Sequence, residues 1–247
     1  MVELSTLEII LISLIFIWTG FVRSGLGFGG AALGLPLMLL VLPEPLFFLP
    51  IIGVHLLFFS SITLINRLDN VAWQTLFRAL IIMILPMIAG ILGLLNLPGS
   101  VMSLLVFAIT LIYGMSYAFN YSITSRNRWL DMLLLIFGGY VSGASLIGAP
   151  LIVAVLTQHV AARSLRDTLL VLWFVLVCIK MSAFILAEVD LHLRLAVELL
   201  PIAAIGHFVG LRAHDYILST GGIQFKRYLG TTMVLVALAG LLQLYMG

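Results

Sequence analysis

The chain has few charged residues. They make up 9% of its 247 residues, whereas an ordinary soluble domain carries about 25%. Hydrophobic residues make up 63% of the chain, and the mean hydropathy is +1.25. A chain of this composition cannot cover itself with a polar surface in water. Because its apolar runs reach the length that crosses a bilayer core of about 30 Å, we expect an all-α polytopic membrane protein.

Cysteines and clusters of reactive side chains are also scarce. Cys178 is the only cysteine and lies in an apolar segment, which excludes an intrachain disulfide. The zinc motif HExxH does not occur, and the acidic residues are scattered over predicted loops. The basic residues stand singly in short loops, which gives no sign of a nucleic-acid partner. We therefore expect a protein that is not an enzyme and that holds no cofactor or metal.

The start of the chain lacks the features of a signal peptide, because Glu3 stands where basic residues are needed and no small-residue cleavage site follows. We interpret it as a retained first span. Ten apolar segments are predicted in all. The long ones are about 7–22, 46–65, 76–95, 101–120, 168–187 and 228–246, and the short ones about 26–42, 129–141, 145–158 and 195–211. The short segments are either broken helices that enter part way or helices around which the bilayer thins.

Two glycine-containing stretches interrupt these runs and resemble each other. Residues 24–30 read SGLGFGG, and residues 142–148 read SGASLIG. A further echo appears at an offset of 120, which aligns Gly90 with Gly210 and Asn70 with Asp190. An offset of 118 aligns the first motif with the second. It places Ser24, Gly25 and Gly30 on Ser142, Gly143 and Gly148, respectively.

The charges of the loops indicate that the two halves are inverted. Lys and Arg favour the cytoplasmic side in short loops. Corresponding loops of the two halves differ in charge, so we predict two inverted five-segment repeats, residues 1–122 and 123–247, with both termini away from the cytoplasm. Loops after odd-numbered segments carry Arg67, Arg126, Arg128, Arg163, Arg166, Arg212, Lys226 and Arg227, and those after even-numbered segments carry mainly Glu44, Glu188 and Asp190, with Arg194 the exception.

The interruptions have two interpretations. Irregular backbone at membrane depth is tolerated only where protein buries it or where it lines a wet cavity. Matching interruptions in inverted repeats point to a transporter with its substrate near the midplane, between the repeats. Helix N-termini freed there suit an anion. However, glycines four residues apart, as in Gly25/Gly29 and Gly139/Gly143, also let membrane helices pack closely without any ligand.

Charged residues within the apolar segments are the remaining candidates. Lys180 is either a functional group or a side chain that snorkels to the interface. Arg23 adjoins the first interruption and could face an anion or anchor the helix at the interface. We expect His55 and His207 to be structural. The candidate substrate-binding residues are Ser24, Gly25, Gly30, Ser142, Gly143, Gly148, Arg23 and Lys180.

The sequence resembles the TauE/SafE family of sulfite and sulfonate exporters. The motif SGLGFGGAALGLP and its repeat SGASLIGAP carry the resemblance, together with NRLDNVAW and its echo EVDLHLRL. The second motif departs from the family's denser glycine run, with Ile147 in the position that Gly29 takes in the first. The resemblance implies a secondary transporter of small sulfur-containing or related organic anions in the bacterial inner membrane.

We therefore expect an exporter of sulfite or organosulfonates that works by alternating access. An interior-negative potential drives an anion outward by about 2.3 kcal/mol per charge per 100 mV, and no chain of intramembrane carboxylates is evident that could relay protons for uptake. The alternative is a membrane scaffold whose glycines serve only packing, and a membrane enzyme is disfavoured. The expected partners are a small anion and membrane lipid, with a homo-oligomer left open.

Overall fold

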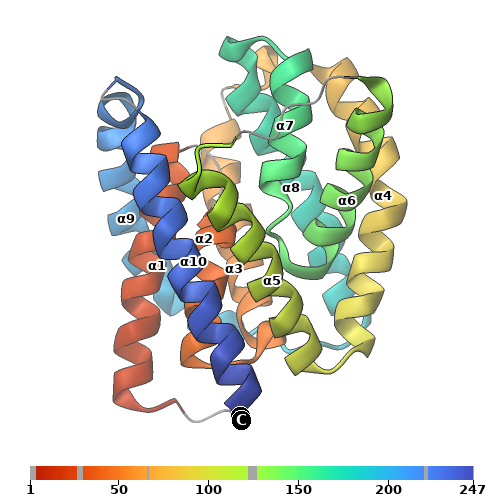
Figure 1. Cartoon of the computed structure of the whole chain (residues 1–247). Coiled ribbons are helices and arrows are strands. Elements are labelled where there is room, and N and C mark those ends of the chain that lie inside the picture. Colours follow the sequence, from red (N-terminus) through yellow and green to blue (C-terminus); the bar gives the residue numbers. More distant parts are fainter. Residues whose placement is uncertain (1–3, 27–29, 66, 122–126, 220–221, 247) are drawn as a thin grey trace. The chain divides into compact units, whose positions relative to one another are not determined.

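The computed structural model describes residues 4–26, 30–65, 67–121, 127–219 and 222–246, and these residues form helices and short connections without a strand. Each of the ten predicted segments coincides with one α-helix (Figure 1). The helices are α1 (Thr6–Leu26), α2 (Gly30–Val41), α3 (Pro45–Leu64), α4 (Trp73–Asn96), α5 (Gly99–Ala118), α6 (Arg128–Ser145), α7 (Ala149–His159), α8 (Ala162–Leu186), α9 (Leu193–Ser219) and α10 (Gly222–Met246), and a 3-10 turn, η1, covers Leu68–Asn70.

Three of the predicted helix ends are wrong by six residues or more. The helix expected at 168–187 already begins at Ala162, the one expected at 195–211 continues to Ser219, and the one expected at 228–246 already begins at Gly222. Arg163, Arg166 and Arg212 therefore lie on helices, as do Lys226 and Arg227 of α10. Hydropathy marks the part of a helix that suits the membrane core, whereas Arg, Leu and Ala continue a helix beyond it because their helix propensity is high.

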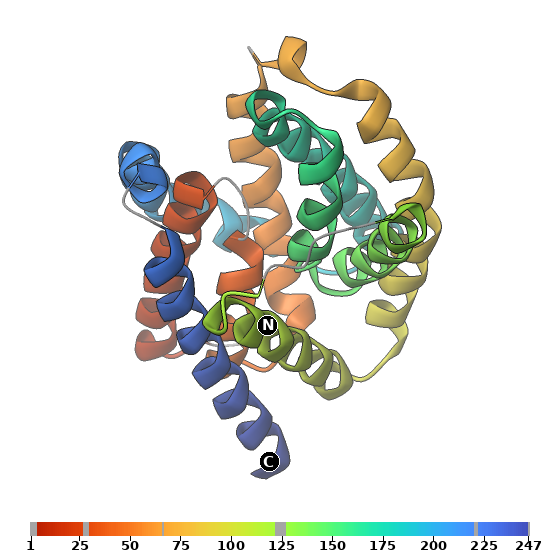
Figure 2. The same cartoon turned by 45° about the horizontal axis from the view of Figure 1, so that its top comes forward.

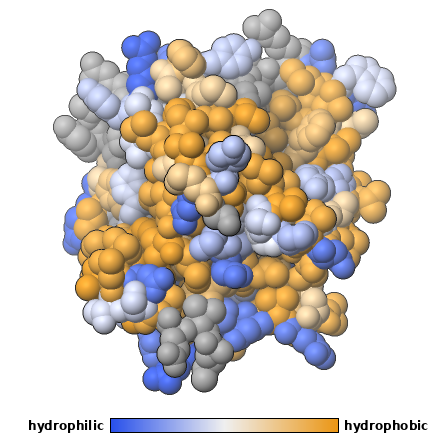
Figure 3. Space-filling model, turned by 60° about the horizontal axis from the view of Figure 1, so that its bottom comes forward, coloured by the Kyte–Doolittle hydropathy of each residue, from blue (hydrophilic) through white to orange (hydrophobic). Residues whose placement is uncertain are grey.

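Seven of the described helices are long and apolar enough to cross a membrane, and the chain is a multi-pass membrane protein. The apolar helices α2 and α7 have only 12 and 11 residues. At 1.5 Å per residue they cover about 18 and 16 Å, which is too short for a bilayer core. Apolar side chains dominate the face shown in Figure 3, and residues such as Ile81, Leu85 and Leu186 are largely exposed. Acyl chains are the solvent that suits this surface.

The helices form two compact units, each of which combines helices from both halves of the sequence. Unit 1 comprises residues 1–48, 99–121 and 194–247, and unit 2 comprises residues 49–98 and 122–193. Unit 1 thus contains α1, α2, α5, α9 and α10, and unit 2 contains α4, α6, α7, α8 and most of α3. The boundary at 122/123 between the two predicted repeats is not a boundary between two contiguous units.

In unit 1, α5 packs along α10, and α2 packs against α1, α5 and α10 (Figure 2). The helices α1 and α9 meet closely at glycines. A Cβ atom on Gly206 would collide with the backbone of Ile17, and one on Gly210 would collide with that of Phe21. Small residues let membrane helices approach until their backbones touch, so α1 and α9 form one tight pair.

In unit 2, the tightest pair is α4 with α6. A Cβ atom on Gly90 would collide with the carbonyl of Tyr140, and one on Gly139 would lie 2.7 Å from the carbonyl of Met83. The helices α7 and α8 pack beside this pair and share its apolar core. The buried core residues include Met83, Met87, Ile91, Leu135, Ile152, Leu156, Leu172 and Leu176.

Candidate functional site

The interruption predicted in the second half lies between α6 and α7. Helix α6 ends at Ser145, and Leu146 then adopts a left-handed conformation with φ 60° and donates its N–H to the Ser142 carbonyl at 3.0 Å. Ile147 is fully buried, Gly148 caps the next helix, and α7 begins at Ala149. A left-handed residue is the usual way to end a helix, and here it reverses the chain within three residues.

The N-terminus of α7 presents hydrogen-bond donors at this break. The first amides of a helix have no intrahelical acceptor, and Ala149 and Leu151 carry such amides, whereas Pro150 has none. The Ser142 hydroxyl lies against the Gly148 cap, since a Cβ on Gly148 would collide with Ser142 Oγ. Ser142 is 1% exposed, and its hydroxyl has no hydrogen-bond partner among the described residues. A buried hydroxyl without a partner is costly, so this donor is available for a ligand.

Lys180 of α8 binds the other side of the break. Its ammonium donates to the Gly143 carbonyl at 2.6 Å, reaches the Ser142 carbonyl at 3.5 Å, and lies 5.6 Å from the ring centroid of Phe184. Lys180 is 1% exposed, so its side chain does not snorkel to the interface. The last carbonyls of a helix lack partners and carry partial negative charge. The Lys180 ammonium thus stabilises the end of α6.

Gly143 belongs to the contact between α6 and α4. A Cβ atom there would collide with the Met87 carbonyl and lie 3.1 Å from the amide nitrogen of Ile91. The glycine lets the two backbones touch, as the packing interpretation expects. Gly143 therefore supports the site through the position of α6, while Ser142, one residue earlier, lies against the N-terminus of α7.

In the first half, the corresponding motif ends α1. Ser24 is buried, and its hydroxyl lies 2.5 Å from Nδ1 of His207 on α9. Gly25 lies at the crossing of α1 with α9, where a Cβ on Gly210 would come within 3.0 Å of its nitrogen. Gly30 begins α2, and its Cβ position lies 3.0 Å from both the Cβ of Arg23 and the carbonyl of Thr19. Residues 27–29 of the motif lie outside the described residues.

The structure thus brings the predicted site residues together in two groups. Ser142, Gly143, Gly148 and Lys180 meet in unit 2, at the α6–α7 break. The second group, in unit 1, is Ser24, Gly25, Gly30 and Arg23 at the end of α1 and the start of α2. Of the other residues considered, His55 is buried on α3 with an edge contact to Phe59 at 6.3 Å between ring centroids.

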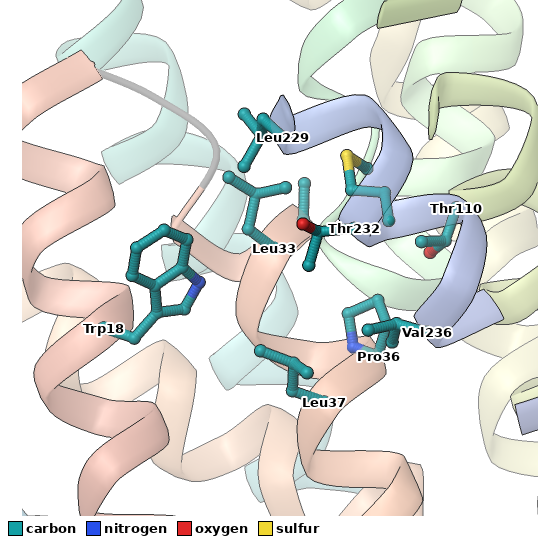
Figure 4. Close-up of a pocket in the computed structure, with 10 residues that line it drawn as sticks. Trp18, Leu33, Pro36, Leu37, Thr110, Leu229, Thr232 and Val236 are labelled. Atoms are coloured by element: carbon teal, nitrogen blue, oxygen red, sulfur yellow. The ribbon is translucent and has the colours of Figure 1, made fainter. Parts of the chain in front are cut away.

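Unit 1 also holds a small cavity of about 50 Å³ among α1, α2, α5 and α10 (Figure 4). Its lining is apolar apart from the indole of Trp18 and the hydroxyls of Thr110 and Thr232. Both hydroxyls donate to carbonyls of their own helices, those of Val106 and Tyr228. None of the ten lining residues is charged, so the cavity is poorly suited to an anion.

Two polar contacts between segments distant in sequence were missed by the sequence analysis. His207 was expected to be structural, and the structure gives it a hydrogen-bond partner, the Ser24 hydroxyl. The sequence signal for this contact was the position of His207 between Gly206 and Gly210. These two glycines let this face of α9 pack closely against α1. Asp167 was predicted in a loop, but it is buried on α8, with Arg67 at 3.8 Å. The neighbouring Thr168 accepts a hydrogen bond from the N–H of Ala72 at 3.0 Å. No periodic signal in the sequence indicates that α8 contacts the connection between α3 and α4.

The comparison with known families decides the class of the protein. The family model described as "Sulfite exporter TauE/SafE" matches residues 12–240. The chain belongs to this family. No curated protein and no solved structure gives a significant match to it. The TauE/SafE family consists of membrane transporters for sulfite-type anions, and the match covers both interrupted motifs of the chain.

The α6–α7 break can bind an anion without a formal charge of its own. Helix N-termini bind anions through oriented amides and the helix dipole, and the Ser142 hydroxyl adds a further donor. The Lys180 ammonium points at carbonyls of α6 instead, whereas the Ser142 hydroxyl has no partner among the described residues. No group of three or more His, Cys, Asp or Glu side chains suited to a metal occurs among the described residues.

Proposed function

We propose that this TauE/SafE transporter exports small sulfur-containing anions, such as sulfite or organosulfonates, by alternating access. The observation that carries the proposal is the buried Ser142 hydroxyl, which lies at the N-terminus of α7 and has no partner among the described residues. Sulfite and sulfonate groups present three oxygens around one sulfur. Several converging donors, namely the hydroxyl and the first amides of α7, match such a group.

The similar construction of the two motifs supports inverted repeats over residues 1–122 and 123–247. Helix α1 ends at Leu26 and α2 begins at Gly30, while α6 ends at Ser145 and α7 begins at Ala149, an offset of 119 in both cases. Each motif helix also packs through glycines against a long helix of the other half, α1 against α9 and α6 against α4. Transporters built from such repeats bind their substrate where helices are interrupted.

The packing interpretation applies to some of the glycines but not to Ser142. Gly25 and Gly143 lie at helix crossings, where a small residue is needed with or without a substrate. A scaffold protein would need no buried hydroxyl without a partner, because such a group lowers stability. Ser142 is therefore the residue that distinguishes a transporter from a scaffold.

Export fits the energetics of an anion that moves without a coupled ion. An interior-negative potential of 100 mV contributes about 2.3 kcal/mol per charge, which corresponds to roughly a 50-fold concentration ratio for a monovalent anion. The protein then has only to provide a selective path. The direction of net movement follows from the voltage.

Efflux of sulfite from proteoliposomes, with and without an imposed interior-negative potential, tests this function. We expect efflux above that of empty liposomes, accelerated by the potential, with the same behaviour for an organosulfonate. Reconstituted protein that releases neither anion faster than empty liposomes would contradict the proposal and favour the scaffold alternative.

A further inference from the structure

The pair formed by Ser24 and His207 distinguishes the first motif from the second. Ser24 Oγ lies 2.5 Å from His207 Nδ1, whereas the equivalent hydroxyl of Ser142 has no partner among the described residues. At the offset that aligns Gly90 with Gly210, the residue corresponding to His207 is Met87. The histidine is thus an addition to one motif only and is not required by the helix packing that both motifs share.

The pair is held in a fixed geometry. Gly206 and Gly210 flank His207 on α9, and their Cβ positions would collide with the backbone of Ile17 and Phe21 on α1. The Cβ atom of Ser24 lies 3.0 Å from the position that a Cβ atom on Gly210 would take. Because the two helices touch at both glycines, the backbones that carry Ser24 and His207 are held at a fixed distance from each other.

The chemistry of this pair depends on one proton. When the imidazole is neutral and carries its proton on Nε2, Nδ1 accepts the hydrogen bond and the Ser24 hydroxyl must donate to it. When a proton binds at Nδ1, both ring nitrogens are donors. Nδ1–H then donates to Ser24 Oγ, and the hydroxyl hydrogen of Ser24 is released for another acceptor. Ser24 becomes a free donor, as Ser142 already is.

The charged residues nearest to the pair in sequence are basic. This part of α9 packs against α1. The charged residues described on α1 are Arg23, which is next to Ser24, and Glu8. Glu8 lies about 24 Å from Ser24 along the helix. On α9, the charged residues with described side chains are Arg212, five positions away, and the Arg194–Glu198 ion pair at the start of the helix. The nearest charges in sequence are therefore positive, and an anion would offset their repulsion of a protonated His207.

We propose that Ser24 and His207 form a proton-binding site that is linked to binding of an anion beside them, at the first motif. A proton taken up at Nδ1 adds a positive charge and releases one hydrogen-bond donor, and both changes strengthen binding of an anion. The anion in turn strengthens binding of the proton, because such linkage is reciprocal. The inference rests on the proposed function, since it concerns the anion that the chain is proposed to export.

Binding of methanesulfonate to the purified full-length protein tests the linkage. The sulfonate stays ionised between pH 5.5 and 8, so a pH dependence arises from the protein. We expect wild type to bind about 10-fold more weakly at pH 8 than at pH 5.5, and His207→Gln to bind with a weak, pH-independent affinity. His192→Gln, which removes a histidine from the α8–α9 connection, should retain the wild-type dependence. Equal affinity of wild type at both pH values, or an unchanged dependence in His207→Gln, would overturn the proposal.

Ser24→Ala separates the two parts of the switch. Without the hydroxyl, protonation of His207 still adds a charge but releases no donor. We expect Ser24→Ala to retain a pH dependence with weaker affinity at pH 5.5. An affinity equal to that of wild type at pH 5.5 would exclude release of the Ser24 donor.

The titration of His207 can be measured without any anion transport. Nitrogen-15 spectra of histidine-labelled protein, with His207→Gln used for assignment, report the protonation of each ring. An unperturbed histidine has a pKa of about 6.5, and we expect the His207 signals to move between pH 5 and 8 and to move at higher pH when methanesulfonate is present. Signals that stay constant over this range would overturn the proton site. Titrating signals without methanesulfonate binding or sulfite efflux would contradict the proposed function, and with it the linkage, while the proton site itself would stand.

Discussion

Ser142 and Lys180 have different tasks at the break between α6 and α7. The Ser142 hydroxyl lies against the start of α7 without a protein partner among the described residues. The Lys180 ammonium donates to the last carbonyls of α6. Both are almost completely buried. Lys180 therefore positions the helix end, and at the proposed anion site the positive electrostatic contribution comes from the helix N-terminus and the hydroxyl.

Lys180→Met tests this division. The substitution keeps an unbranched side chain of similar length but leaves the Gly143 carbonyl buried without its donor, so we expect a loss of about 1–3 kcal/mol in the free energy of unfolding. Thermal unfolding in detergent measures it. The control is Arg163→Met at the exposed start of the same helix, which should change stability by less than about 0.5 kcal/mol. A Lys180→Met protein as stable as wild type, with weaker anion binding, would make Lys180 a direct ligand.

At the scale of the elements, close contact between α4 and α6 fixes the position of the Ser142 motif. Gly143 has no room for a Cβ atom because the Met87 carbonyl occupies that space. Gly93, on the facing helix α4, has room, with the nearest atom 3.7 Å from its Cβ position. The same substitution at these two glycines should therefore have opposite effects.

We expect Gly143→Ala to destabilise the protein by about 1–3 kcal/mol, because the added methyl group separates two packed helices. Gly93→Ala should stabilise it by about 0.5–1 kcal/mol, since alanine has the higher helix propensity. Thermal unfolding of the two variants in one detergent provides the comparison. If Gly143→Ala is as stable as Gly93→Ala, the α4–α6 contact is looser than the structure has it.

The elements were predictable where a single property determines them. Apolar runs located all ten helices, because each run must be satisfied by helical hydrogen bonding in lipid. They did not give the start of α8, which begins before its apolar run, or the end of α9, which continues as helix after its run has ended. The Ser-Gly motif predicted the break after α6. The partners of Ser24, Lys180 and Asp167 lie on helices distant in sequence, and no local pattern in one sequence specifies such contacts.

At the scale of the whole molecule, the loop charges and the number of helices lead to one topology. If all ten helices act as membrane segments, an even number places both termini on the same side. The basic residues near the odd-numbered connections, such as Arg67 and Arg128, then lie in the cytoplasm by the positive-inside rule. We therefore propose that both termini face away from the cytoplasm of a bacterial inner membrane.

Reporter fusions at the C-terminus measure this orientation. We expect a C-terminal alkaline phosphatase fusion to be active, because that enzyme works only outside the cytoplasm, and a green fluorescent protein fusion at the same position to be dark. A fusion placed after Arg67, in the connection between α3 and α4, should behave in the opposite way. A fluorescent C-terminal fusion would show that the number of spans is odd or that the molecule is inverted.

The most direct test of the central claim is voltage-driven sulfite efflux by Ser142→Ala, with Ser145→Ala as its control. Both serines are buried in the last turn of α6, but Ser145 donates to the Val141 carbonyl at 2.9 Å, whereas Ser142 has no partner in the described part of the chain. We predict about 3- to 10-fold slower efflux at low sulfite concentration for Ser142→Ala, equivalent to one hydrogen bond of about 1 kcal/mol. Its thermal stability should equal or exceed that of wild type, because a buried hydroxyl without a partner is removed. Ser145→Ala should retain wild-type efflux. Wild-type efflux by Ser142→Ala would contradict an anion site at the start of α7.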